Sequence, residues 1–255
     1  MVQLNRDSKL RVYLDDPYWS RLIAKSYKHE PELHHVFRRL SGLAYTLIDC
    51  GANFGYWSIL VSSEAYGSKK VLAVEASPST YQDLLGNCKL NGDRFQCFHQ
   101  AVTTVPGARA AVRSANGHPG ASITFETDAL DNLATVETVS LDALVQRQSA
   151  QLPSSAPLFV KLDVEGQEIN AFKGAEHLLA RDTAFCYEDH GKDVGAPVTR
   201  YILDELHLRV MYPYPDGSLL AIESVQEAAR IQTRRTHGYN FLAFRPETSF
   251  AQFLS

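Results

Sequence analysis

The chain has 255 residues, of which 45% are hydrophobic and 21% are charged, as is typical of a globular protein with one sizeable core. Its formal net charge of -4 does not favour a nucleic-acid-binding function, because nucleic-acid-binding proteins usually carry a basic surplus. No stretch approaches the roughly 18 apolar residues of a membrane span and the first residues form no apolar leader, so we expect a cytoplasmic protein.

The N-terminal segment, residues 1–44, is predicted to be mainly helical. Residues 31–40 begin with proline and carry leucine, valine and phenylalanine at helical spacing on one face. From residue 45 onward, short apolar runs alternate with helical stretches. The sequence therefore predicts a main domain at 45–255, preceded by an added helical segment.

The first part of that domain is predicted to contain three strands, at 45–49, 70–75 and 95–102. Helices are expected between them, at 55–66 and 77–91. The second helix has a serine cap followed by proline at its start and an Asn-Gly pair at its end, which are common helix boundaries.

Residues 103–135 differ in composition, since glycine, serine, threonine and asparagine are frequent there. Residues 110–113 and 122–125 have the pattern of strands, and the turn-forming residues 116–120 join them. We therefore predict a β-hairpin insertion here and no helix. A further short strand is expected at 137–140.

Regular alternation resumes after residue 157. The expected strands and helices follow in turn at 158–163, 167–180, 184–188, 198–206, 208–212 and 240–245. Strands that alternate with helices favour an α/β fold with a mostly parallel, doubly wound, Rossmann-like sheet.

The turn after the first strand predicts a nucleotide-type cofactor site. Asp49 ends the strand, Gly51 and Gly55 allow a tight turn and a close approach of the backbone to a ligand, and Asn53 lies between them. The pattern differs from the GxGxxG of dinucleotide-binding turns. An acid before the first glycine suits an ammonium group better than a pyrophosphate, and S-adenosylmethionine carries an amine and no phosphate.

The ends of the next two strands extend this site. Glu75 follows the first glycine turn at the distance typical of a carboxylate that accepts hydrogen bonds from ribose hydroxyls, although it could also be an ordinary acid at a strand end. Ala76 follows it. Gln100 and Ala101 end the third strand, where an adenine edge is expected, and the amide of Gln100 offers both a donor and an acceptor.

A second polar group follows the later strands. Lys161 and Asp163 come from one strand end, and Glu188, Asp189 and His190 come from the next, so all should face one crevice. The acids, namely Asp163, Glu188 and Asp189, could hold Mg²⁺ or another divalent cation. The crevice could equally contain a metal-free base, for which histidine is suited near neutral pH. The alternative without a function is a network of ion pairs.

Three blocks of the sequence, residues 48–58, 139–144 and 160–168, resemble the FkbM family of class I methyltransferases. The resemblance implies a seven-stranded sheet whose last strand is antiparallel, with S-adenosylmethionine as cofactor. It also implies O-methylation of a small hydroxyl acceptor such as a sugar or polyketide. Family members often carry Tyr-Glu-Pro before the first strand, and residues 28–31 match this only in part, which puts a role for Glu30 in doubt.

For such a reaction we expect Asp163, with Glu188 or His190, to assist loss of the hydroxyl proton, and Lys161 to position groups or balance charge. Two other functions share the architecture. An NAD(P)-dependent dehydrogenase is disfavoured by the loop, and a cofactor-binding regulatory or scaffold protein without turnover is disfavoured by the charged crevice. Neither a nucleic-acid partner nor a membrane span is expected, and the oligomeric state stays open.

Overall fold

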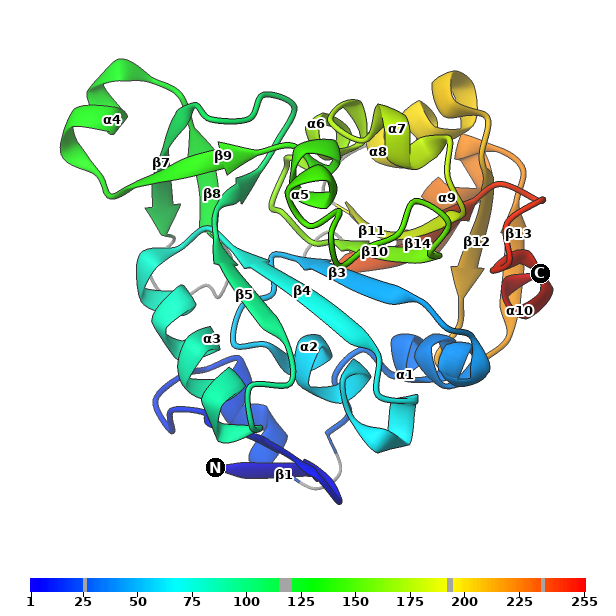
Figure 1. The fold of residues 1–255 in the computed structure, drawn as a ribbon. Helices are drawn as coiled ribbons and strands as arrows, with labels where there is room; N and C mark the ends of the chain where they lie inside the picture. The colour runs from blue at the N-terminus through cyan, green and yellow to red at the C-terminus, as the bar shows by residue number, and fades with distance from the viewer. Residues whose placement is uncertain (25–26, 115–120, 192–194, 235–236) are drawn as a thin grey trace.

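The computed structural model describes residues 1–24, 27–114, 121–191, 195–234 and 237–255. Its largest sheet is built from β3 (Thr46–Cys50), β4 (Lys70–Glu75), β5 (Gln96–His99), β10 (Leu158–Leu162), β11 (Thr183–His190), β12 (Arg209–Pro213), β13 (Leu219–Ile222) and β14 (Gly238–Phe244). These eight strands lie in the order β13-β12-β14-β11-β10-β3-β4-β5 (Figure 1). The sequence predicted seven; β13 is the additional one, paired with β12 as an edge hairpin.

Neighbouring strands from β5 to β11 run parallel, whereas β14 runs antiparallel to both β11 and β12. This arrangement confirms the predicted Rossmann-like class and its antiparallel last strand. The chain moves away from β3 toward β5, and later in the opposite direction from β10 to β11. The strand order therefore reverses between β3 and β10, and sheets of this kind bind ligands at the carboxyl ends of the strands beside such a reversal.

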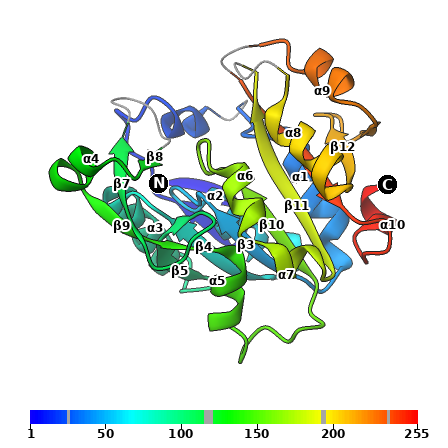
Figure 2. The same ribbon diagram turned by 90° about the horizontal axis from the view of Figure 1, so that it is seen from above.

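Helices cover both faces of the sheet (Figures 1 and 2). One layer contains α1 (Pro31–Arg39), α2 (Tyr56–Val61), η3 (Glu64–Tyr66), α3 (Pro78–Leu90) and α10 (Ala251–Leu254). The other contains α5 (Leu141–Arg147), α6 (Glu168–Lys173), α7 (Glu176–Leu179), α8 (Pro197–Tyr201), η4 (Ile202–Leu206) and α9 (Val225–Ile231).

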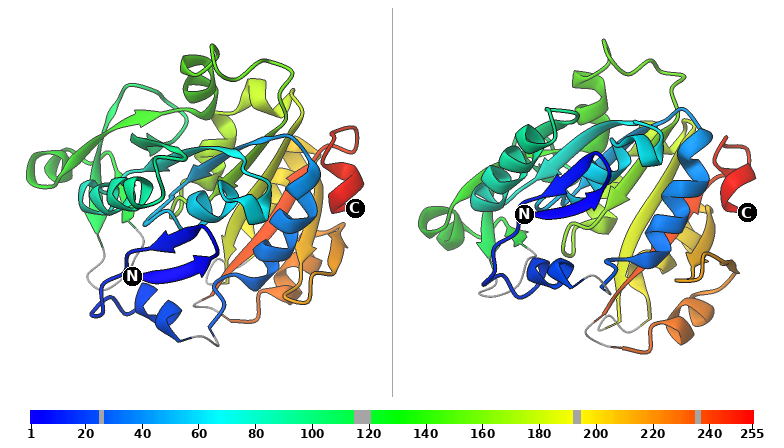
Figure 3. Two further views of the ribbon diagram at one scale, coloured as in Figure 1. Left: turned by 60° about the horizontal axis from the view of Figure 1, so that its bottom comes forward. Right: turned by 90° about the horizontal axis from the view of Figure 1, so that it is seen from below.

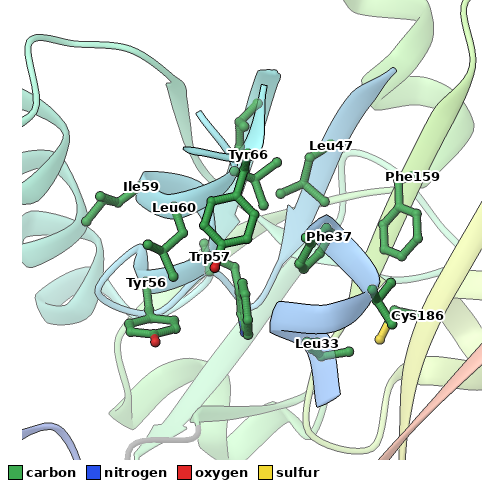
Figure 4. Packing of buried hydrophobic residues seen from close by; sticks show 14 of the residues in the cluster. Leu33, Phe37, Leu47, Tyr56, Trp57, Ile59, Leu60, Tyr66, Phe159 and Cys186 are labelled. Atoms are coloured by element: carbon green, nitrogen blue, oxygen red, sulfur yellow. The ribbon is translucent and has the colours of Figure 1, made fainter. Parts of the chain in front are cut away.

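Each central strand contributes side chains to the cores on both faces of the sheet, because successive side chains of a strand point to opposite faces. Leu47 and Phe159 pack in the first layer, whereas Ile48 and Val160 pack in the second. Phe37 of α1 lies among Trp57, Leu47 and Phe159 (Figure 4), with its ring centroid 5.2 Å from that of Phe159. Complete burial of a side chain of this size stabilises a fold by about 1.5–3 kcal/mol.

The N-terminal segment is only partly as predicted. Its helical part, η1 (Trp19–Ile23), α1 and η2 (Leu40–Gly42), is present, but the chain begins with a β-hairpin of β1 (Val2–Asn5) and β2 (Ser8–Leu10). This hairpin lies against the rest of the fold (Figure 3). The side chain of Asn91, directly after α3, holds it there, since Asn91 Oδ1 accepts from the Lys9 N–H at 2.9 Å. Contacts with residues far along the chain therefore explain the difference. The division at residue 44 stays a prediction.

The insertion forms a second, four-stranded sheet of β6 (Ala101–Val102), β9 (Thr135–Val139), β7 (Arg109–Ser114) and β8 (Ala121–Thr124), in that order. The antiparallel pairing of β7 with β8 confirms the predicted hairpin, and the predicted turn at 116–120 lies outside the described residues. The expectation of no helix was wrong, because α4 (Thr127–Asn132) follows the hairpin. Asp128 in its first turn is an acid where the helix dipole favours one. In the described part of the chain no helix is long and apolar enough to cross a membrane.

Candidate active site

A cavity of about 740 Å³ opens at the carboxyl ends of the central parallel strands, beside the reversal of strand order. All the residues predicted for the cofactor line it except Gly55, and so do all four predicted catalytic residues. This lining comprises Asp49, Gly51, Asn53, Glu75, Ala76, Gln100, Ala101, Lys161, Asp163, Glu188 and His190. One cavity therefore joins the two polar groups that the sequence indicated separately.

The turn after β3 requires glycine at position 51. Gly51 has φ +75°, and a Cβ there would lie 1.8 Å from the backbone oxygen of Asp163. The N–H groups of Gly51 and Ala52 donate to the Val74 oxygen at 2.9 and 3.0 Å, which fixes the turn on β4. Gly55 lies behind the cavity at the start of α2, where a Cβ would approach Leu84 of α3 to 2.8 Å.

Asp49 is 1% exposed and its Oδ2 accepts from the Ser58 hydroxyl at 2.6 Å. Burial raises its pKa, and the ammonium of Lys161 opposes that shift. Asn53 adopts φ +52°, and its Oδ1 accepts from the Trp19 indole at 3.0 Å. The N-terminal segment is thereby tied to the turn.

Glu75 presents a carboxylate held by backbone donors. One oxygen accepts from the Asn53 N–H at 2.9 Å and the other from the Ser77 N–H at 2.8 Å. Burial raises its pKa to about 7, although these hydrogen bonds favour the ionised form. Each carboxylate oxygen can accept a second hydrogen bond, so the group fits a pair of ribose hydroxyls.

The end of β5 adds a mainly apolar part of the cavity, where Ala76 and Ala101 offer small surfaces. Gln100 also lines it, but its Nε2 donates to Glu137 Oε1 of β9 at 3.3 Å. The amide therefore faces the small sheet as well as the cavity.

Lys161 is 3% exposed, and its Nζ lies 2.9 Å from Asp163 Oδ2. Burial opposes the charged form of the lysine, but Asp163, Glu30 and Asp49 outweigh it and raise the Lys161 pKa well above its usual value. The lysine is thus a permanent positive charge among carboxylates. The predicted proximity of Lys161 and Asp163 is confirmed.

Glu188 and His190 follow on β11. His190 Nε2 lies 3.3 Å from Glu188 Oε2 and 3.8 Å from Glu165 Oε2. Burial, Asp163 and Glu30 raise the Glu188 pKa well above its usual value. A Cβ at Gly238 of β14 would lie 1.5 Å from Glu188 Oε1, so the glutamate occupies the space that this glycine leaves.

Asp189 does not join this group, which corrects the prediction for it. It points to the opposite face of β11, because successive strand side chains alternate. It is 1% exposed, and its Oδ2 accepts from the Thr199 N–H at 3.0 Å and the Thr199 hydroxyl at 2.9 Å. Its contacts hold the start of α8 against the sheet.

The predicted divalent cation does not fit the site either. Of the three proposed ligands, Asp189 faces away, Asp163 contacts the Lys161 ammonium, and Glu188 faces His190. Among the side chains that the structure describes, no group of three or more His, Cys, Asp or Glu could hold a metal ion. We therefore derive no step that uses one.

The N-terminal segment supplies part of the cavity wall, which the sequence did not predict. Glu30 lines the cavity, accepts from the Trp57 indole, and accepts from Asn240 Nδ2 at 2.9 Å. Burial favours its neutral form, but Lys161 and His29 lower the pKa of Glu30 below its usual range. The partial match at 28–31 pointed to Glu30, whereas its contact with Asn240, 210 residues away, has no local signal.

The geometry agrees with a comparison against known families. Residues 49–210 match the methyltransferase FkbM domain. The chain belongs to this family. The match includes the turn after β3 together with Glu75, Lys161, Asp163 and β11, so it covers both parts of the cavity.

Individual relatives are more distant. The hexuronic acid methyltransferase AglP of Haloferax volcanii is 29% identical over 166 residues, which are 61% of this chain and 60% of that protein. A precorrin-6y C5,15-methyltransferase from Geobacter metallireducens superposes with a TM-score of 0.47 at 11% identity, over 87% of this chain and 92% of that one. An O-methyltransferase from Bacillus cereus in complex with SAH gives 0.46 at 13% identity, over 89% and 88%.

Proposed function

We propose that this protein is an S-adenosylmethionine-dependent O-methyltransferase that acts on a hydroxyl of a sugar or similar small metabolite. The observation that carries the proposal is the union, in one cavity, of a methyltransferase-family cofactor turn with a buried group of ionisable side chains. A protein that only bound the cofactor would have no need for such a group beside it. The group comprises Lys161, His190 and the acids Asp163, Glu165 and Glu188.

The cofactor half would use groups that are already fixed in place. Glu75 would accept from the ribose hydroxyls, and the turn at Asp49 and Gly51 would face the methionine part. The adenine would lie beyond Glu75, against Ala76 and Ala101. The carboxylates of Asp49 and Glu75 are buried in the cavity wall. Hydrogen bonds to charged groups contribute more than those between neutral groups.

S-adenosylmethionine, when bound, supplies a methyl group activated by its sulfonium. Transfer forms a C–O bond as the C–S bond breaks, and the acceptor hydroxyl loses its proton. We assign that proton to His190, because its side chain lines the cavity and histidine is the side chain most often used as a general base. Glu165, 3.8 Å from His190 Nε2, would offset the positive charge that the imidazole gains, and Glu188 at 3.3 Å would hold the ring in place.

Lys161 and Asp163 would orient the reacting groups. Asp163 stands at the end of β10, next to the turn after β3, and its side chain is about one third exposed to the cavity. Lys161 holds that carboxylate and balances its charge. Asp163 is therefore the acid nearest to where the methyl group would be transferred.

A sugar-type acceptor suits the remaining wall. Glu30, Glu32 and Asn240 lie there, and carboxylates and amides are good partners for multiple hydroxyl groups. The relative from Haloferax volcanii is named for a hexuronic acid, which makes hexuronic acids and their neutral parent sugars the first acceptors to try.

The test measures binding and turnover separately. Calorimetry with S-adenosylmethionine, S-adenosylhomocysteine and NADH would show the first two bind and the third does not. Incubation with S-adenosylmethionine and a set of neutral sugars, hexuronic acids and polyketides would then give S-adenosylhomocysteine and an acceptor heavier by one CH₂. Failure to bind the cofactor overturns the proposal, and binding without turnover on any acceptor favours a regulatory role.

A further inference from the structure

The hairpin insertion and the cofactor cavity share a boundary. The insertion's β6 begins at Ala101, immediately after Gln100, and β6 pairs with β9 of the small sheet. The small sheet therefore begins directly after the end of β5, where Gln100 and Ala101 line the cavity.

Ile123 of β8 is the point at which the insertion reaches the cavity. Among the described residues between 103 and 157, it is the only one that lines the cavity. It is half-buried and packs on the small hydrophobic cluster of Ala101, Ala110, Val112 and Val136. Ala76 packs on the same cluster, so Ile123 and Ala76 both line the cavity and pack against the same buried side chains.

These wall residues suit a flat apolar ring. Ala76 and Ala101 leave room because their side chains are single methyl groups, and Ile123 supplies a branched aliphatic surface. The polar neighbour Gln100 is held by Glu137 of β9, so the insertion also orients the Gln100 amide. Flat aromatic rings gain most of their binding energy from burial of their faces.

We propose that Ile123 of β8 forms one face of the adenine pocket. The inference rests on the proposed function, because it assumes that S-adenosylmethionine occupies the cavity with its ribose at Glu75. Its consequence is that the bound cofactor contacts β8 directly.

Titration calorimetry with S-adenosylhomocysteine tests this without an acceptor. Ile123→Ala should raise the Kd about tenfold, because several buried methyl and methylene groups are lost, and Ile123→Leu should stay within about twofold of the parent protein. Val112→Ala is the matched control, since Val112 pairs directly with Ile123 but does not line the cavity. It should lower the melting temperature and leave the Kd unchanged.

Hydrogen exchange gives a second measurement on the unaltered protein. Amides of β7 and β8 should become more protected when S-adenosylhomocysteine binds. Unchanged affinity of Ile123→Ala, an equal loss in Val112→Ala, or unchanged exchange in β7 and β8 would each overturn the assignment of Ile123. An unaltered protein that does not bind S-adenosylhomocysteine would instead overturn the proposed function.

Discussion

Glu75 and Glu188 are both carboxylates near the carboxyl end of a strand in the same sheet, but they are held in different ways. Glu75 accepts from two backbone N–H groups, those of Asn53 and Ser77. Glu188 instead faces the side chain of His190 at 3.3 Å and lies over Gly238 of a strand distant in the sequence.

The proposed cofactor half of the cavity, around Glu75, is therefore fixed by backbone geometry. The proposed acceptor half, around Glu188 and His190, is fixed by charged side chains whose ionisation states depend on one another, since burial, Asp163 and Glu30 all raise the Glu188 pKa. The comparison teaches that substitutions in the first half should change affinity, whereas substitutions in the second should change rate.

The largest effect is expected for His190→Gln. Removal of a general base lowers turnover by about 10²–10⁴-fold, while the cofactor affinity should stay the same. His177→Gln is the matched control, because His177 also faces a carboxylate, Asp142 at 3.1 Å, but on the surface. Equal turnover in the two variants would remove His190 from the reaction.

Asp163→Asn should reduce turnover by at least about 10²-fold, because loss of the charge that orients the reacting groups would misplace them, and a misplacement of about 1 Å costs this much. Asparagine keeps the size and much of the hydrogen bonding, so the melting temperature and the affinity for S-adenosylmethionine should change little. Lys161 retains Asp49 and Glu30 as carboxylate neighbours. If turnover is kept and the melting temperature falls, Asp163 only balances Lys161 and has no part in the reaction.

Glu75→Ala should weaken S-adenosylmethionine binding by about 1.5–3 kcal/mol, the range for hydrogen bonds to a charged group. Glu168→Ala is the control: Glu168 is also buried, with a pKa raised to about 7 chiefly by burial, but it does not line the cavity. Calorimetry should show the loss only for Glu75, and an unchanged Kd in Glu75→Ala would exclude it from the site.

The pH dependence of binding should follow the Glu75 pKa of about 7. Ribose hydroxyls need the ionised carboxylate, so S-adenosylhomocysteine should bind about tenfold more weakly at pH 6 than at pH 8. The free energy of unfolding without ligand should change with pH in the opposite direction. Because the Glu75 pKa is higher in the folded protein than in the unfolded chain, its contribution to stability is complete below the pKa of the unfolded chain and is lost as pH rises through about 7. Both slopes should diminish in Glu75→Gln, and a flat binding profile in the parent protein would contradict the assignment.

The smallest effect concerns the opposite face of β11. Thr199→Val removes a hydroxyl that donates to Asp189 at 2.9 Å and contacts the Tyr187 hydroxyl at 2.9 Å. Thermal unfolding should show a loss of about 1–2 kcal/mol, with turnover per folded molecule unchanged. A loss of turnover at constant stability would mean that Asp189 belongs to the acceptor half after all.

The sequence predicted that the residues of the turn after β3 and Glu75 lie together, and the cavity lining confirms this for all but Gly55, because the geometry of the turn is local. The acid, glycines and asparagine of the turn lie within seven residues, and alternation along β10 is enough to bring Lys161 and Asp163 to one face. The same alternation separates Asp189 from Glu188 and His190, and the sequence already contained that information. The prediction that all three line one crevice is therefore wrong for Asp189.

Other features had no local signal. The β1–β2 hairpin depends on the side chain of Asn91, directly after α3, and the contact of Glu30 with Asn240 depends on the register of β14 beside β11. A short strand such as β13 becomes recognisable only when its partner β12 is known, because four residues carry too little pattern by themselves. Long-range pairing decided these parts of the fold.

The space above Gly238 links two positions that are 50 residues apart. Any Cβ at 238 would overlap the present position of the Glu188 carboxylate, so a larger residue at 238 would require that side chain to move or to be shorter. A relative with a larger residue at the position of Gly238 should have lost or shortened the acid at the position of Glu188. The residue at the position of Gly238 therefore predicts, in a related sequence, whether an acid is present at the position of Glu188, beside the histidine.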